Sequence, residues 1–285
     1  MGGGSWTKAA FTTYATTAYN ACVSDVSSAI TTNLSNQDIF KSRGLVKELN
    51  PYKVVRQCAD SEEHPNTIPV ILALDVTGSM GDAAVEVAKK LGTIMQDLYG
   101  KITDVEFMTM GIGDLSYDDS PIQASQFESD IRIMEQLDKI YFEFGGGGNN
   151  YESYTSAWYF GLHNTDLDCY TKRGKKGIII TMGDERLNPY LPNFQLNSAL
   201  GSTEQGSVET PKLYEEASKK FDIYHIDVNH RVYRDEGIDS SWAILGDNYK
   251  KANMNNISDI ITEVIISSAS SVSNVSVDEE GCITW

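Results

Sequence analysis

The hydrophobic positions of this chain fall into two patterns that alternate along the sequence. Short apolar runs predict buried strands, because consecutive apolar residues suit a strand covered on both faces. These runs lie at 70–75, 104–112, 140–144, 177–182 and 221–228. Apolar residues spaced three and four apart predict amphipathic helices at 84–98, 130–138, 154–162, from 211 onward and at 257–265. This alternation indicates an α/β fold with a doubly wound, mostly parallel sheet flanked by helices.

The chain divides into three parts by composition. Residues 1–65 form an N-terminal extension, rich at first in Thr, Ala and Ser, with a helix expected from Lys8 to Ala29 and a break at Asn50 and Pro51. Residues 66–267 carry the α/β pattern, and residues 268–285 form a Ser-containing tail. With 285 residues and 41% hydrophobic content, the chain can bury one large core.

Charge and composition exclude several classes of partner. The net charge of −17 opposes binding to phosphate backbones, so we expect no nucleic-acid partner. No stretch approaches the roughly 18 apolar residues of a membrane span, and the start lacks a secretory apolar segment. We therefore expect a cytoplasmic protein without a membrane partner. The four cysteines lack the spacing of a zinc or redox motif.

The run that begins at Val70 ends in the most informative motif of the chain. Asp75 closes the run, and Thr77 and Ser79 follow at alternate positions, with Gly78 between them. The carboxyl edge of a parallel sheet is where such folds bind ligands, and one tight turn there would gather these three oxygen-bearing side chains. Oxygen ligands of this kind suit a hard cation: Mg²⁺, or Mn²⁺ or Ca²⁺.

At this motif the chain resembles the von Willebrand factor type A family, whose metal-ion-dependent adhesion site (MIDAS) carries the pattern Asp-x-Ser-x-Ser. Here Thr77 replaces the middle serine and keeps the hydroxyl. Haloacid-dehalogenase-like phosphatases also open their site with an aspartate at a strand end. They need a second aspartate where this chain has Thr77, so the adhesion-site interpretation is favoured.

The resemblance covers about residues 66–267 and implies two further ligand loops. The second follows the glycines at 145–148, where Asn149 stands in place of the threonine of the family. Either Asn149 through its amide oxygen, or Glu152 directly or through water, is the expected ligand there. The third loop supplies Asp184, which follows an extra Met182 and Gly183. The predicted metal ligands are thus Asp75, Thr77, Ser79, Asn149, Glu152 and Asp184.

A narrower resemblance links the chain to uncharacterised von Willebrand type A proteins of bacteria and their phages. It rests on residues 60–66, on the Asp-Val-Thr-Gly-Ser-Met run, on residues 146–149 and 152–154, and on residues 183–185. That group implies a fold and a site but no activity. Bacterial proteins of the family are often encoded with AAA-type ATPases, which makes such an ATPase a candidate partner.

The ligand set favours binding over turnover. Thr77 and Ser79 are neutral, so the bound cation keeps positive charge and open positions that a partner's Asp or Glu can fill. No nucleophile–base pairing is recognisable in the sequence. We therefore expect a non-enzymatic module for metal-dependent protein–protein interaction.

Two alternatives remain open at this stage. One is a metal-dependent hydrolase that uses Glu185 or Glu152 as general base toward a metal-bound water. The other is a structural or virion-associated interaction protein that needs no metal. We also predict that the irregular stretch Leu187 to Thr210 borders the metal, with Tyr190 and Phe194 helping to select the partner. The aromatic residues of the helix around Trp158 are expected to be core.

Overall fold

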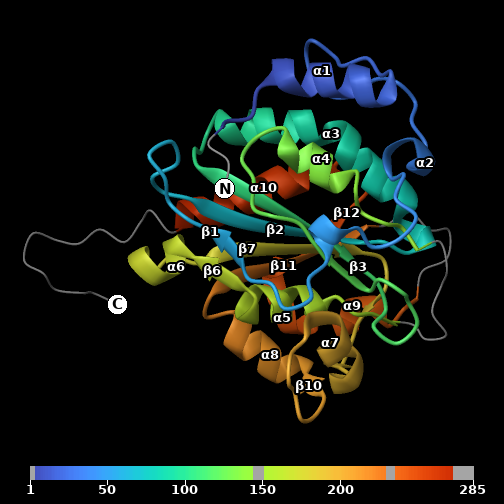
Figure 1. Ribbon diagram of the computed structural model, residues 1–285, viewed down its shortest axis with the longest axis vertical. Coiled ribbons are helices and arrows are strands. Elements are labelled where there is room, and N and C mark those ends of the chain that lie inside the picture. Colours follow the sequence, from blue (N-terminus) through green and yellow to red (C-terminus); the bar gives the residue numbers. More distant parts are fainter. Residues whose placement is uncertain (1–3, 144–150, 229–234, 272–285) are drawn as a thin grey trace, which may run out of the picture.

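The computed structural model describes residues 4–143, 151–228 and 235–271. At its centre lies a six-stranded sheet in the order β12-β11-β7-β2-β3-β4, in which only β4 runs antiparallel to its neighbour (Figure 1). The predicted α/β fold with a mostly parallel sheet is therefore confirmed. The strands are β2 (Ile68–Asp75), β3 (Val105–Ile112), β4 (Ile122–Ala124), β7 (Gly177–Gly183), β11 (Phe221–Val228) and β12 (Tyr249–Ala252).

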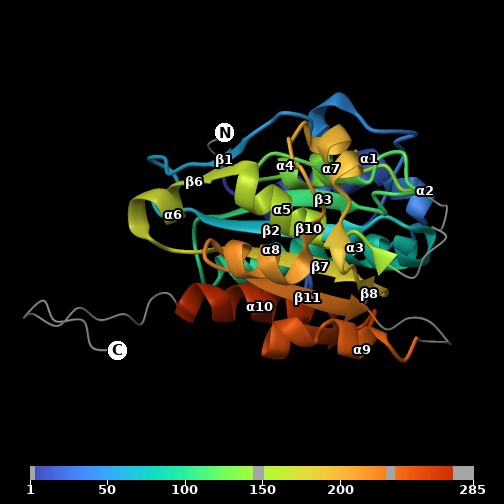
Figure 2. The same cartoon turned by 90° about the horizontal axis from the view of Figure 1, so that it is seen from below.

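Helices cover both faces of the sheet (Figures 1 and 2). Alternate residues of a strand point to opposite faces, so Val70 and Leu72 join one apolar cluster while Ile71 and Ala73 join the other. The first cluster includes α3 (Gly81–Tyr99), α4 (Arg132–Leu137) and α10 (Ile257–Ser271). The second includes α5 (Thr155–His163), α6 (Asp168–Arg173), α7 (Asn193–Leu200), α8 (Thr210–Ala217) and α9 (Ile238–Ser241).

Short elements complete the chain around this framework. Two-residue or three-residue strands pair outside the main sheet: β1 (Arg56–Cys58) with β6 (Thr165–Leu167), β5 (Tyr151–Glu152) with β8 (Arg186–Leu187), and β9 (Tyr190–Leu191) with β10 (Val208–Glu209). The 3₁₀ helices are η1 (Lys47–Leu49), η2 (Gly78–Met80) and η3 (Ala243–Asn248). Within the described residues, no helix combines the length and the apolar character that crossing a bilayer requires.

The N-terminal segment packs on the outside of α3. Its helix α1 (Lys8–Tyr19) begins at Thr7, whose hydroxyl accepts a hydrogen bond from the Ala10 amide, and ends where Asn20 turns left-handed. The predicted helix to Ala29 is therefore wrong beyond Tyr19. A second helix, α2 (Asn36–Ile39), follows, and Phe11 of α1 is fully buried in the cluster shared with α3.

Two other sequence predictions differ from the structure. The strand expected at 140–144 is reduced, within the described residues, to a single bridge between Glu143 and Thr77. The stretch from Leu187 to Thr210 is not irregular, because it contains α7 and the β9–β10 pair. Pro192 precedes the helix and Gly201 ends it in a left-handed conformation, so these two residues mark its boundaries.

Candidate functional site

The strand order places two loops that carry predicted ligands side by side. From β2 the chain crosses to β3 on one side and later to β7 on the other, so the crossover direction reverses at β2. Ligand sites of open α/β sheets lie at such a reversal, beyond the carboxyl ends of the strands. Asp75 is the last residue of β2, and Asp184 directly follows β7.

Hydrogen bonds link four of the six predicted ligands in one chain of oxygens. The Thr77 amide and hydroxyl donate to Asp75 Oδ1 at 2.9 and 2.6 Å. The Thr77 and Ser79 hydroxyl oxygens lie 3.3 Å apart, and the Ser79 hydroxyl donates to Asp184 Oδ1 at 3.1 Å. The tight turn into η2 thus gathers side-chain oxygens from two adjacent strand ends, as the motif predicts.

Tyr154 is a site residue that sequence reasoning missed. Its hydroxyl donates to Asp75 Oδ2 at 2.7 Å and accepts from the Glu185 amide at 3.3 Å. Gly183 makes room for it, because a Cβ at that position would lie 2.0 Å from the tyrosine oxygen. The sequence pattern assigned Tyr154 to the core, which its complete burial supports, but no local signal points to the hydroxyl contact.

The second ligand loop is described only in part. Asn149 lies outside the described residues, so its predicted role stays a prediction. Glu152 lies on β5, which pairs with β8 just beyond Asp184. The Glu152 side chain is buried, and its Oε2 has no hydrogen-bond partner among the described residues.

Negative charges are crowded at this edge. Burial raises the pKa of Asp75 to about 7. The hydrogen bonds from Thr77 oppose this increase in pKa, and the charge of Asp184 adds to it. Burial and then the charge of Asp75 raise the pKa of Glu152 to about 10. Burial likewise raises the pKa of Tyr154 well above its usual value. The largest charge effects on both groups come from other carboxylates, Asp184 for Asp75 and Asp75 for Glu152.

This donor set fits a hard cation better than a transition metal. Within the described residues, no group of three or more His, Cys, Asp or Glu side chains forms a metal cluster by itself. The gathered donors are instead two hydroxyls and two carboxylates, and Glu152 Oε2, which has no hydrogen-bond partner in the described part of the chain, adds a further oxygen. Neutral hydroxyls and carboxylates are oxygen ligands that Mg²⁺ and Ca²⁺ accept, and a cation there would offset the repulsion among the acids.

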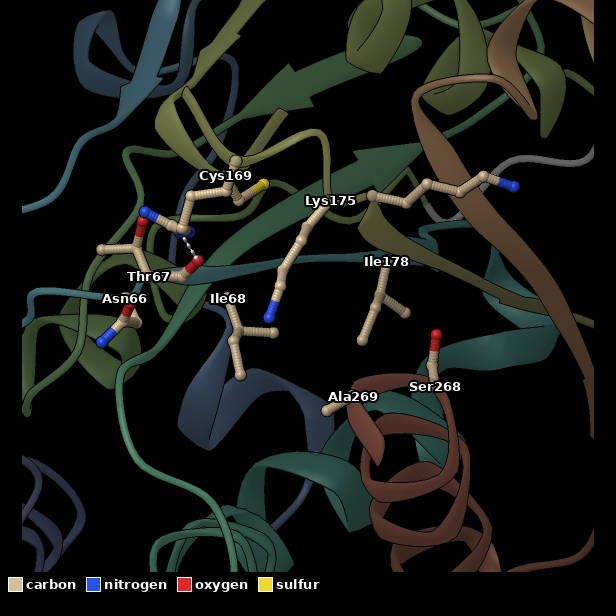
Figure 3. A pocket seen from close by; sticks show the side chains of 10 residues that line it. Asn66, Thr67, Ile68, Cys169, Lys175, Ile178, Ser268 and Ala269 are labelled. Atoms are coloured by element: carbon tan, nitrogen blue, oxygen red, sulfur yellow. Dashed lines mark hydrogen bonds between the residues drawn. The ribbon is translucent and has the colours of Figure 1, made fainter. Parts of the chain in front are cut away.

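The opposite edge of the sheet has a different chemistry. A pocket of about 130 Å³ lies between the first residues of β2 and β7 and the end of α10, and Lys175 reaches over it between Ile68 and Ile178 (Figure 3). Asp60 pairs with Arg173, and Asp222 with Lys176 at 3.4 Å. Of the three cationic side chains that line this pocket, Arg173 and Lys176 are therefore paired with carboxylates of the same chain. Arg173 is the last residue of α6, and Lys175 and Lys176 lie between α6 and β7.

Comparisons with known proteins find only distant likeness. No protein-family model and no curated protein matches the chain. Among solved structures, the pilus adhesin SpaC of Lactobacillus rhamnosus GG in its open conformation is 14% identical, with a TM-score of 0.48, over 78% of this chain and 31% of SpaC. The chain thus spans less than a third of the length of SpaC.

Two further solved structures are similar at the same level. The vWF domain of the type V pili tip protein Mfa5 from Porphyromonas gingivalis is 11% identical, with a TM-score of 0.46, over 75% of this chain and 98% of that domain. Proximal thread matrix protein 1 from the mussel byssus is 10% identical, with a TM-score of 0.45, over 71% and 48% of the two chains.

Proposed function

We propose that this chain is a non-enzymatic module that recognises a protein partner through a divalent cation. The cation is Mg²⁺, or Mn²⁺ or Ca²⁺, held in a MIDAS-like site by Asp75, Thr77, Ser79 and Asp184. Asn149 or Glu152 completes the ligand set from the second loop. When bound, the cation supplies a positive centre to which an Asp or Glu of the partner binds.

The observation that carries this proposal is the chain of oxygens from Asp75 to Asp184. It joins the ends of two adjacent parallel strands at the point where the crossover direction reverses. The surrounding carboxylates raise the cost of leaving Asp75 ionised without a cation. Thr77 and Ser79 add no charge, so a dication held here retains positive charge for a partner carboxylate.

The partner is a protein that presents one Asp or Glu from an otherwise neutral or basic face. The charge of −17 attracts a basic surface at long range, whereas the exposed cation attracts a carboxylate only at close range. An AAA-type ATPase is one candidate, suggested by the family resemblance. The cytoplasmic location and the absence of nucleic-acid and membrane partners remain predictions.

Calorimetry with Mg²⁺ and Mn²⁺ tests the metal site directly. Because a ligand that binds only the folded state stabilises it by RT ln(1 + [L]/Kd), metal at 100 Kd should add about 2.7 kcal/mol to the free energy of unfolding. Asp75→Asn, which keeps an acceptor for Thr77, and Ser79→Ala should lose both the binding heat and the stabilisation. Asp247→Asn, at an exposed acid, is the matched control. Equal stabilisation of wild type and Asp75→Asn would refute the site.

Partner capture tests the interaction. A partner isolated from the native host should be released by EDTA and should bind neither Asp75→Asn nor Ser79→Ala. Capture that survives chelation would leave the metal without a role in recognition and would favour the metal-independent structural alternative. Hydrolysis of phosphate esters that Asp75→Asn abolishes would instead favour the hydrolase alternative.

A further inference from the structure

A groove of about 370 Å³ opens beside the candidate metal site. Three segments far apart in the sequence form it: the N-terminal segment at 45–52, the loop between β3 and β4 at 115–122, and α7 at 194–199. Figure 2 shows α7 beside the N-terminal part of the chain. We refer to these three segments together as the α7 groove.

Large apolar side chains line the α7 groove and are exposed to solvent. Phe194 is 78% exposed, Tyr52 47% and Leu45 37%. Two more aromatic residues are exposed. Tyr117 lies on the β3–β4 loop, and Tyr190 lies on β9, just before α7. Exposed apolar side chains are ordinary when scattered, but gathered around one hollow they mark an interaction surface.

The charge of the α7 groove is negative. Among its lining residues, all within the described part of the chain, none is a lysine, arginine or histidine, whereas Asp118 and Asp119 stand on one wall. The Asp118 carboxylate accepts the Asp114 amide at 2.7 Å, which holds the turn in place, and Asp119 is exposed. An apolar occupant with flanking positive charge therefore complements this surface.

Hydrogen bonds connect the acidic wall to the candidate metal site. The Glu143 carboxylate accepts the amides of Asp119, at 3.1 Å, and Ser120, and the Glu143 amide donates to the Val76 carbonyl at 3.0 Å. On the other side, the Leu115 amide donates to the Ser153 hydroxyl at 3.0 Å, next to Glu152. The β3–β4 loop thus forms one wall of the α7 groove and is linked through Glu143 to Val76, the residue that follows Asp75.

We propose that the α7 groove binds a short segment of the protein partner that carries an apolar side chain flanked by Lys or Arg. The apolar side chain packs between Phe194, Tyr52 and Leu45, and the basic residue pairs with Asp118 or Asp119. The same partner places its carboxylate on the cation, so this inference rests on the proposed function and names the second contact of that interface.

Selection of peptides from a random 12-residue library displayed on phage tests the groove without knowledge of the partner. The full chain is the target, and EDTA is present so that binding through the cation is suppressed. We expect enrichment of peptides that combine Leu, Ile, Phe or Trp with Lys or Arg. Each enriched peptide is then synthesised, and its Kd is measured by fluorescence anisotropy for wild type and variants.

Three substitutions alter the groove in different ways. Ala199→Arg fills it and adds positive charge, Asp119→Lys reverses the charge of its wall, and Phe194→Ser removes an exposed apolar contact. Each should weaken peptide binding about tenfold or more. Val26→Ser removes another exposed apolar side chain, which does not line the groove, and should leave Kd unchanged. The thermal midpoint of each variant identifies any that fail to fold.

Other outcomes would overturn this inference. They are the absence of enriched peptides, peptides without basic residues, or binding that Ala199→Arg and Phe194→Ser leave unchanged. The metal site can be refuted without refuting the groove, because the two are measured separately. Asp75→Asn should lose Mg²⁺ binding and still bind the groove peptides. Groove variants that lose the peptides but keep the calorimetric Mg²⁺ signal would place the peptides in the groove and leave the metal site intact.

Discussion

Tyr154 and Thr77 hold the two oxygens of the Asp75 carboxylate separately. The tyrosine hydroxyl donates to Asp75 Oδ2 at 2.7 Å, while Oδ1 accepts two hydrogen bonds from Thr77. Both oxygens of this buried carboxylate are therefore oriented before any ligand arrives. Loss of a group that orients a metal ligand in this way typically lowers metal affinity about 10- to 100-fold.

Tyr154→Phe removes this orienting bond and the longer one from the Glu185 amide, while keeping the aromatic ring. We expect Mg²⁺ affinity, measured by calorimetry, to fall about 10- to 100-fold. Without metal, the free energy of unfolding should fall by about 1–3 kcal/mol, because Asp75 Oδ2 loses its donor in a buried environment. Tyr159→Phe is the control, since Tyr159 lies on the same helix and donates to Glu204 at 2.7 Å instead. Unchanged Mg²⁺ affinity in Tyr154→Phe would contradict the orienting role.

Gly183→Ala tests the close approach that this arrangement requires. The added Cβ would lie 2.0 Å from the Tyr154 oxygen and 2.4 Å from its Cζ, so the ring must move away from Asp75. Urea unfolding should show a loss of about 1–3 kcal/mol, together with weaker Mg²⁺ binding. Gly206→Ala, where a Cβ meets nothing within 4 Å, should cost no stability. Equal free energies of unfolding for the two variants would show that the Tyr154 ring can move away from Gly183 without loss of stability.

The contact between α1 and Asp138 should make stability depend on pH. Asp138 accepts hydrogen bonds from Tyr14, at 2.5 Å, and from Tyr19. Burial, only partly opposed by these two hydrogen bonds, raises its pKa from 3.8 to about 6. The folded state therefore binds more protons than the unfolded chain between these values, and stability from this group falls as pH rises through that window, by about 3 kcal/mol in all.

Asp138→Asn should remove that contribution while leaving an acceptor for one tyrosine. Urea unfolding at pH 4 to 7 should show a flatter profile for the variant, with its stability relative to wild type increasing toward pH 7. Asp247→Asn should follow the wild-type profile. Parallel profiles for wild type and Asp138→Asn would contradict the raised pKa of this carboxyl.

The sequence by itself determined four strands of the main sheet, β2, β3, β7 and β11, and the turn that follows Asp75. The buried runs that end at Asp75 and near Asp184 predict two of the central strands, because only a strand covered on both faces tolerates continuous apolar residues. The spacing of Asp75, Thr77 and Ser79 is local, so one turn suffices to bring these side chains together. That information lies within five consecutive residues and needs no knowledge of the rest of the fold.

Only the tertiary structure decided which distant groups meet these residues. The Tyr154 contact depends on the position of α5 relative to β2 and on the missing Cβ of Gly183, and neither leaves a pattern along the chain. The α7 groove likewise needs three segments separated by up to about 150 residues. Sequence periodicity reports which face of an element is buried. It does not report which partner lies against that face, because that depends on how the separate elements pack together.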